Sequence, residues 1–410
     1  MKRILFVDDE IKVLDGIRRM LFAERDRWEM HFAQNAEQAL EACDRGSFDV
    51  VISDMRMPGM DGAALLARIR TRFPETARIV LSGYSEVSVA MRTASDAHRF
   101  LAKPCKPSEL KETIERVLAL RELVASPEIR RVVGGIGQLP SLSTTYVSLT
   151  EAVKDPNTSI GQLTAIIERD VAMAAKVLQL TNSAFFGLPQ HITNLACAVS
   201  YLGMGTIKSL ALASEVFRVF KPGPGIRISV CDSMQHHALQ VATIAGALPI
   251  PSPLRDHALI AGLLHDIGKL FLASTMQDDY CAVAAKVSAC GCPWFEAERE
   301  ILGACHAEIG AYLLGLWGIP ELAVEAIAHH HNPCRIPHSS FDCTEALFVA
   351  NLLAHELKCE SETLASGEFR EDDRETLERL GLLPQMKEFR ELAAESLSRQ
   401  NGNFKVCVPS

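Results

Sequence analysis

The stretch DVVISDMRMPGMDG, residues 49–62, decides how the first third of the chain folds. Its apolar run VVIS leads directly into the acid Asp54. A short apolar run of this kind is typical of a buried strand, and functional groups of a parallel sheet gather at the carboxyl ends of its strands. The sequence therefore predicts a strand that delivers Asp54 to the functional edge of a sheet.

Similar apolar runs recur on both sides of this stretch, at residues 4–7, 78–82 and 99–102. Patterns with helical spacing separate the runs, for example between residues 35 and 46. Strands that alternate with helices predict a parallel sheet with helices on both faces. We therefore expect an α/β doubly wound domain at the start of the chain.

Charged and hydroxyl side chains follow these strands at the same predicted edge. They are Asp8, Asp9, Asp54, Ser82 and Lys103. Three carboxylates at one edge repel each other unless a cation lies between them, and Mg²⁺ prefers such hard oxygen ligands. An aspartate can also attack a phosphoryl group, whose charge a lysine would neutralise. Helix capping would explain one of these acids but not the whole set, so we predict a phosphoryl-accepting site.

The first 120 residues resemble a response regulator receiver domain, and we place its boundary at residue 122. The resemblance rests on the segments ILFVDDE, DVVISDMRMPGMDG, IVLSGYSE and HRFLAKPC. It implies a flavodoxin-like sheet with the strand order 2-1-3-4-5.

The resemblance also implies a role for each residue at this edge. Asp54 would be the phospho-acceptor. Ser82 and Lys103 would contact the phosphoryl group, and Phe100 would be the aromatic residue that rotates on activation. The Mg²⁺ ligands would be Asp8, Asp9, Asp54 and the backbone carbonyl of Arg56.

The rest of the chain shows helical periodicity and almost no strand alternation. A Gly- and Pro-rich stretch at 134–142 marks a boundary, and Ser159 and Gln162 have the spacing of a capping box. A helix expected at 110–124 can close the first domain and run on as a connector. Beyond the boundary we expect an all-α bundle with helices near residues 160–167, 171–187, 195–202, 206–219, 233–248, 255–273, 280–290, 295–316, 320–331 and 343–357, and two charged helical patterns within 368–400.

Composition narrows the class of protein. A chain of 410 residues with 48% hydrophobic and 23% charged residues is typical of two or three globular domains. The net charge of −9 and the lack of a Lys/Arg stripe argue against DNA binding. The N-terminus does not resemble a signal peptide and we see no membrane-spanning run. The 12 cysteines are scattered, so we expect reduced thiols and a cytoplasmic protein.

Histidines are the most informative residues of the helical part. Several of the 13 histidines fall at helical positions that could converge, and one of them, His265, has an adjacent acid, Asp266. Imidazoles and carboxylates in one bundle can bind a pair of transition-metal ions that activate water against a phosphodiester. A lone buried histidine is usually a satisfied core residue, and descent from a common fold could also explain the set.

Residues 135–335 resemble an HDOD domain, a relative of the HD and HD-GYP phosphohydrolases. The resemblance rests on QLPSL, AVSYLGMGTIKSLAL, GLLHDIGKL, HAEIGAYLLGLWGIP and AIAHHHNP, with the long segment 155–188. HDOD domains are regarded as signalling modules that have lost catalysis. We expect a helical, Gly-rich linker at 123–134 before this HD-like bundle and a helical extension at 336–410 after it.

The related HD-GYP pattern implies a set of metal ligands in this chain. The matching residues are His237, His265, Asp266, His306, His330, His331 and Asn351. Two departures argue against activity, because the GYP signature is absent and Asn351 replaces the final acid. Iron, manganese or zinc remains a candidate ion, and Lys269 could pair with Asp266 or face a phosphate.

Together these patterns predict a two-component response regulator. A histidine kinase or phosphotransfer protein would phosphorylate Asp54, and the HDOD domain would bind a protein or a nucleotide-type ligand. The alternative is a metal-dependent phosphodiesterase that hydrolyses cyclic di-GMP.

Overall fold

The computed structural model forms two compact units. The first is built on residues 1–141, with 298–304 and 312–319, and the second holds the remainder. The residues that the structure describes are 1–83, 97–135, 158–168, 228–251, 254–316, 319–337, 340–360 and 370–402, with a few further positions between 148 and 207.

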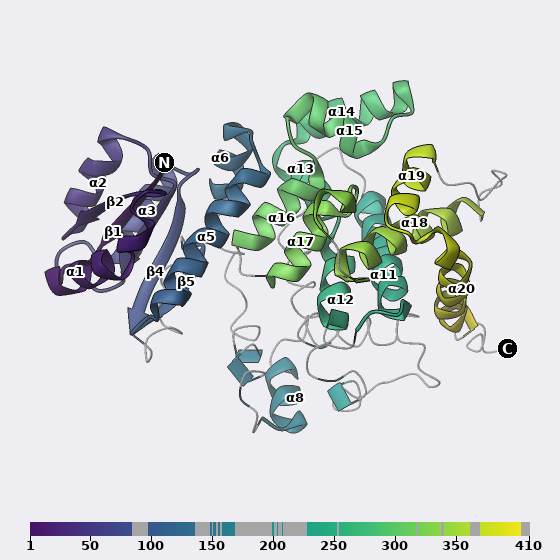
Figure 1. Ribbon diagram of the computed structural model, residues 1–410, viewed down its shortest axis with the longest axis horizontal. Coiled ribbons are helices and arrows are strands. Elements are labelled where there is room, and N and C mark those ends of the chain that lie inside the picture. The colour runs from purple at the N-terminus through teal and green to yellow at the C-terminus, as the bar shows by residue number, and fades with distance from the viewer. Residues whose placement is uncertain are drawn as a thin grey trace. The chain divides into compact units, whose positions relative to one another are not determined.

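A five-stranded parallel sheet forms the first unit (Figure 1). The strands are β1 (Lys2–Val7), β2 (Trp28–Ala33), β3 (Val50–Asp54), β4 (Ala77–Gly83) and β5 (Arg99–Lys103). Their order, β2-β1-β3-β4-β5, confirms the predicted doubly wound fold. The apolar runs of the sequence indicate only four of these strands, because the residues of β2, WEMHFA, mix apolar and polar side chains on an edge strand.

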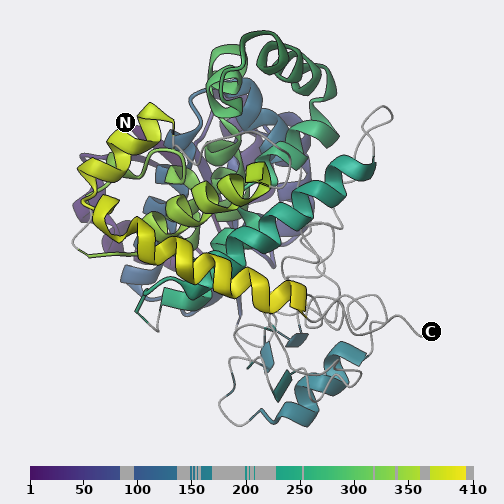
Figure 2. The ribbon, with the colours of Figure 1, turned by 90° about the vertical axis from the view of Figure 1, so that its right-hand side faces the viewer.

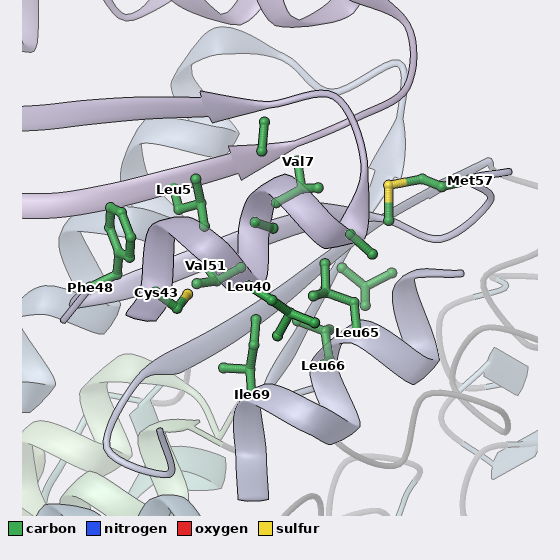
Figure 3. Packing of buried hydrophobic residues seen from close by; sticks show 14 of the residues in the cluster. Leu5, Val7, Leu40, Cys43, Phe48, Val51, Met57, Leu65, Leu66 and Ile69 are labelled. Carbon is green, nitrogen blue, oxygen red and sulfur yellow. The ribbon is translucent and has the colours of Figure 1, made fainter. Parts of the chain in front are cut away.

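Helices cover the sheet, and the side-chain alternation of the strands assigns their faces. Odd-numbered residues such as Leu5 and Val51 pack in one buried cluster with residues of α2 and α3 (Figure 3). On the opposite face, Arg18 of α1 lies 4.5 Å from the ring centroid of Phe32. The helices are α1 (Ile11–Met20), η1 (Phe22–Glu24), α2 (Ala36–Arg45), α3 (Gly62–Arg72), α5 (Pro107–Leu123) and α6 (Pro127–Gly135).

The segment predicted as a linker contains α6, whose end lies against the first unit's own sheet. The fully buried Arg78 donates a hydrogen bond to the carbonyl of Gly134 at 2.7 Å. A Cβ atom at Gly134 would come within 2.0 Å of the Pro74 carbonyl oxygen, so only glycine allows this approach. Helix α6 is thus packed as part of the first unit.

Helices form the second unit, as predicted. They are α8 (Ile160–Glu168), α11 (Ile228–Ala247), α12 (Arg255–Leu264), α13 (Ile267–Thr275), α14 (Gln277–Cys290), α15 (Trp294–Leu302), α16 (His306–Leu316), α17 (Glu321–His329), η5 (Pro333–Arg335), α18 (Cys343–Glu360), α19 (Glu371–Arg379), η6 (Leu383–Gln385) and α20 (Met386–Gly402). The helices expected at 171–187 and 206–219, and most of 195–202, lie outside the described residues.

Two runs that the sequence predicts as single helices are divided in the structure. The run expected at 255–273 is divided between α12 and α13 by the His265–Asp266 pair, and the run at 295–316 is divided between α15 and α16. The predicted capping box is present, since Ser159 N–H donates to Gln162 Oε1 at 2.8 Å and Gln162 N–H donates to Ser159 Oγ at 3.2 Å.

The core of the second unit is formed by α11, α12, α17 and α18, which pack against one another. Figure 2 shows α20 alongside α11, and Arg390 of α20 pairs with Glu356 of α18 at 3.0 Å. The α12–α13 stretch Arg255–Thr275 is long and apolar enough to cross a membrane, contrary to our reading of the sequence. Since 83% of its most apolar window is buried inside the protein, it has the environment of a core helix.

Candidate functional sites

The carboxyl edge of the sheet brings together residues from three strands. Lys103, the last residue of β5, places its Nζ 2.7 Å from Asp8 Oδ2 and also pairs with Asp54 Oδ1. Asp8 directly follows β1, and Asp54 is the last residue of β3. Both carboxylates are buried, whereas Asp9 is exposed. The structure therefore brings Lys103 together with Asp8 and Asp54 at this edge, and Asp9 follows Asp8 in the chain.

The loop after β3 holds the Asp54 carboxylate in place. The backbone N–H of Arg56 donates to Asp54 Oδ2 at 3.0 Å. A Cβ atom at Gly62 would lie 2.0 Å from the Asp54 carbonyl oxygen, so glycine is required where α3 begins. Ser82 pairs in backbone register with Ala102, and Phe100 pairs with Val80, which puts Ser82 and Lys103 at the same edge.

A cluster of imidazoles lies in the second unit, contributed by α11, the α12–α13 turn, α16, the end of α17 and α18. Neighbouring imidazole rings in it have centroids 3.9–5.6 Å apart. The structure brings together all seven predicted residues, His237, His265, Asp266, His306, His330, His331 and Asn351.

A glycine in the α13 helix makes this convergence possible. A Cβ atom at Gly268 would lie 2.0 Å from the His306 carbonyl oxygen, so α13 can approach the start of α16 only with glycine there. The approach places His306 Nε2 3.2 Å from Asp266 Oδ1. Within the HDIGK stretch, Gly268 is therefore the residue that allows α13 to pack closely against the start of α16.

Family models match two parts of the chain. Residues 4–115 match the response regulator receiver domain, and residues 139–333 match the HDOD domain. The chain combines a receiver domain with an HDOD domain. It is 36% identical over 136 residues to the regulatory protein AtoC of Escherichia coli, an alignment that covers 32% of this chain and 28% of AtoC. The chain spans less than half the length of the curated relatives it matches.

Solved structures support the fold of the helical part. A protein from Shewanella amazonensis SB2B has a TM-score of 0.52 and 23% identity, with coverage of 68% of this chain and 98% of that one. An HDOD domain protein from Geobacter sulfurreducens has a TM-score of 0.50 and 19% identity, covering 73% of this chain and 100% of that one. At these identities the likeness concerns the fold alone.

In the receiver domain, electrostatics favour a charged lysine between the acids. Burial alone would lower the pKa of Lys103, but hydrogen bonds to Asp54 and Asp8 outweigh it and raise that pKa. The ammonium offsets one of the three negative charges of Asp8, Asp9 and Asp54. The remaining charge leaves this edge suited to a divalent cation.

In the HDOD domain, backbone carbonyls fix the tautomers of two fully buried histidines. His265 Nδ1 donates to the Gly262 carbonyl at 2.9 Å, and His330 Nδ1 donates to the Ile327 carbonyl at 2.8 Å. Their Nε2 atoms have no hydrogen-bond partner among the described residues. Burial lowers the pKa of His265 to about 4 and that of His330 well below its usual range. Two neutral imidazoles therefore keep their Nε2 lone pairs for another ligand.

Asp266, the acid of this cluster, is charged and lies beside one ammonium and two imidazoles. Burial alone would raise its pKa, but Lys269 counteracts this and holds the pKa of Asp266 well below its usual range. Lys269 Nζ lies 2.8 Å from Asp266 Oδ2. Oδ1 lies 3.2 Å from His306 Nε2 and 3.6 Å from His265 Nε2.

The α18 helix adds a residue that the sequence analysis missed. His355 lies one turn beyond Asn351, with its ring centroid 4.6 Å from that of His237. His237 Nε2 lies 3.0 Å from Asn351 Oδ1 and donates to it. The helical spacing of Asn351 and His355 was the available signal, but it required knowing that α18 lines the cluster.

Proposed function

We propose that Asp54 of the receiver domain accepts a phosphoryl group and that its phosphorylation controls the HDOD domain. The observation that carries this proposal is the buried contact of Lys103 with Asp54 and Asp8 at the carboxyl edge of the sheet. A histidine kinase or phosphotransfer protein of the cytoplasm would supply the phosphoryl group. The incoming charge would draw Ser82 toward it and reorient Phe100.

Phosphorylation would require Mg²⁺ at this edge. The residues present fit that ion, because Asp8 and Asp54 share a single ammonium, Asp9 follows Asp8 in the chain, and hard oxygen ligands suit Mg²⁺. Asp8, Asp9, Asp54 and the carbonyl of Arg56 would hold it. When bound, the ion neutralises charge on the transferring phosphoryl group.

We propose that the HDOD domain is a non-catalytic output that binds a protein or a nucleotide-type ligand. The support is Asn351, a neutral amide that accepts a hydrogen bond from His237 where the catalytic relatives carry an acid. A two-metal phosphodiesterase needs carboxylates to offset and bridge its ions. The alternative, hydrolysis of cyclic di-GMP, is an outcome of the test below.

We also propose that the imidazole cluster can hold a transition-metal ion such as iron, manganese or zinc. The unpartnered Nε2 atoms of His265 and His330 support this. Imidazole ligands whose other nitrogen donates to a backbone carbonyl are typical of metal sites. The ligands would come from His265, Asp266, His306, His330 and His331.

The test of phosphorylation uses a small phosphodonor and Mg²⁺. Asp54→Asn should abolish labelling, because it removes the attacking carboxylate. The matched control, His265→Ala, should label as well as the unaltered chain, because it affects only the HDOD domain. Equal labelling of Asp54→Asn would contradict the assignment.

A second experiment tests whether the HDOD domain hydrolyses cyclic di-GMP. Metal-loaded protein incubated with cyclic di-GMP should leave the nucleotide intact when followed by chromatography. Hydrolysis that disappears in the His265→Ala/Asp266→Ala protein would establish the phosphodiesterase instead.

A further inference from the structure

We propose that Cys290 and Cys292 form a reversible disulfide, which makes the turn between α14 and α15 a redox-sensitive modification site. One residue, Gly291, separates the two cysteines in the sequence CGC. Cys290 is exposed and Cys292 is partly exposed, so an oxidant in solution can reach both thiols. The turn leads into Phe295, whose ring stacks on that of His331 with centroids 4.4 Å apart.

The backbone conformation of Gly291 brings the two cysteines within the range of a disulfide. Gly291 follows the last residue of α14 in the left-handed conformation, with φ 66° and ψ 12°, and its N–H donates to the Val287 carbonyl at 2.9 Å. A residue in this conformation turns the chain as sharply as a helical residue does, so the Cα atoms on either side of it are about 5.5 Å apart. Disulfides span about 4.4–6.8 Å between Cα atoms, whereas an extended residue would separate them by about 7 Å.

The turn also has room for the ring to close. Cys290 and Gly291 are exposed, and a Cβ atom added at Gly291 would meet no atom within 4 Å. Glycine adopts the left-handed conformation without the strain that other residues have there. The backbone of this turn can therefore adjust to an S–S bond without moving a buried side chain.

Other described cysteines differ from this pair in burial or in spacing. Burial raises the pKa of Cys43 to about 11 and that of Cys343 to about 12, so these thiols form little of the reactive thiolate. Cys281 is exposed on α14, nine positions before Cys290 by their residue numbers. That spacing corresponds to roughly 13 Å along a helix, which is too far for a disulfide between them.

The reaction needs an oxidant, and a low-molecular-weight disulfide such as oxidised glutathione is suitable. One cysteine thiolate attacks a sulfur of that disulfide and releases one glutathione thiolate. The second cysteine thiolate attacks the protein sulfur of the mixed disulfide, forms the S–S bond and releases the other glutathione. The two thiol protons pass to the two glutathiones, so the cysteine pair is oxidised and the glutathione disulfide is reduced. Exposed disulfides are readily reduced again, as a transient cytoplasmic modification requires.

The experiment maps the oxidised cysteines in the full chain. Reduced protein, freed of metal ions by a chelator, is incubated with oxidised glutathione, alkylated and digested with trypsin. Cleavage after Lys286 and Arg299 gives a peptide that contains Cys290 and Cys292 and no other cysteine. We expect mass spectrometry to show that this peptide loses the mass of two hydrogen atoms and both alkylation sites. Dithiothreitol should restore both.

The cysteines themselves supply the controls. Cys281 lies in the preceding tryptic peptide and should carry a glutathione adduct, because it has no neighbouring cysteine within that peptide. Cys290→Ser and Cys292→Ser should each retain a glutathione adduct on the remaining cysteine of the pair. Cys281→Ser, the matched control on the same helix, should form the disulfide as the unaltered chain does.

Three outcomes would overturn the proposal. The first is a peptide that carries glutathione adducts without losing two hydrogen atoms, and the second is a peptide that stays reduced after Cys281 has reacted. The third is a disulfide at Cys292 that persists in Cys290→Ser, which would show that Cys292 pairs with another cysteine. The measurement involves neither phosphorylation of Asp54 nor a metal ion, so it is independent of the proposed function.

Discussion

Lysine–carboxylate pairs occur at both sites, with different consequences. In the receiver domain Lys103 contacts two buried acids, yet the edge keeps excess negative charge for a cation. In the HDOD domain Lys269 neutralises the one carboxylate of the cluster. The residues of the receiver edge were predictable, because each follows an apolar strand and parallel strands end at one edge. His355 was not, since helical spacing does not show which face of a helix lines a site.

The buried residue His98 leads to a prediction about how stability depends on pH. It is buried directly before β5 and accepts a hydrogen bond from the backbone N–H of Arg78 at 3.1 Å. Burial and the Arg78 charge hold its pKa well below its usual range, so unfolding at acid pH lets it take up a proton. Its contribution to stability is therefore present above about pH 6.5 and is lost, at about 1.4 kcal/mol per pH unit, as the pH falls below that value.

The check compares urea unfolding at pH 7 and pH 5.5. His98→Asn keeps an acceptor for the Arg78 N–H but cannot titrate. Other buried histidines affect both proteins equally, so the unaltered chain should lose about 1 kcal/mol more than His98→Asn over this interval. Equal losses would mean that His98 is protonated in the folded protein.

Individual elements show where sequence patterns carry enough information and where they do not. The α/β alternation predicts four strands, but β2 has too mixed a composition for its pattern to be recognised. The apolar run at 255–273 looks continuous, and the structure divides it at His265–Asp266. The close helix contacts beside this division depend on partners far away in the sequence. Gly268 and His306 are an example, 38 positions apart by their residue numbers.

We expect Gly268→Ala to destabilise the HDOD domain. The added Cβ would lie 2.0 Å from the His306 carbonyl oxygen, so α13 and α16 must separate. Overpacking of this kind typically costs about 1–3 kcal/mol. The matched control is Gly246→Ala in α11, where no atom lies within 4 Å of the added Cβ. That change should be neutral or stabilise by up to about 1 kcal/mol, as measured by urea unfolding.

The whole molecule consists of an α/β domain and a helical domain, as predicted, and the segment predicted as a helical linker contains α6, whose end packs against the first unit. In the sequence, Gly134 and Gly135 indicate a domain boundary. In the structure Gly134 permits close contact between α6 and Pro74. A glycine that ends a helix and a glycine that permits a close approach look alike in one sequence, so this contact could not be predicted.

Fragments of the chain test this boundary. Residues 1–135 should be more stable than residues 1–122, because the shorter fragment deprives the buried Arg78 guanidinium of the Gly134 carbonyl. Loss of one partner of a buried charged group costs roughly 1–3 kcal/mol. Urea midpoints of the two fragments provide the measurement. Within 1–135, Gly134→Ala should lose stability, while Gly135→Ala, whose Cβ would lie 3.9 Å from Pro74 Cβ, should not. Equal urea midpoints for all four proteins would show that α6 adds no stability to the first unit, as expected of a linker.

The position of α18 has a consequence for how genes that encode such domains can recombine. The HDOD match ends at residue 333, yet α18 packs against α11, α12 and α17 and supplies Asn351 to the imidazole cluster. A gene fusion that joined foreign sequence directly after residue 333 would expose the interior of the bundle. Recombination that preserves a working HDOD domain must therefore carry residues 343–360 with it, although they fall beyond the family's recognised end.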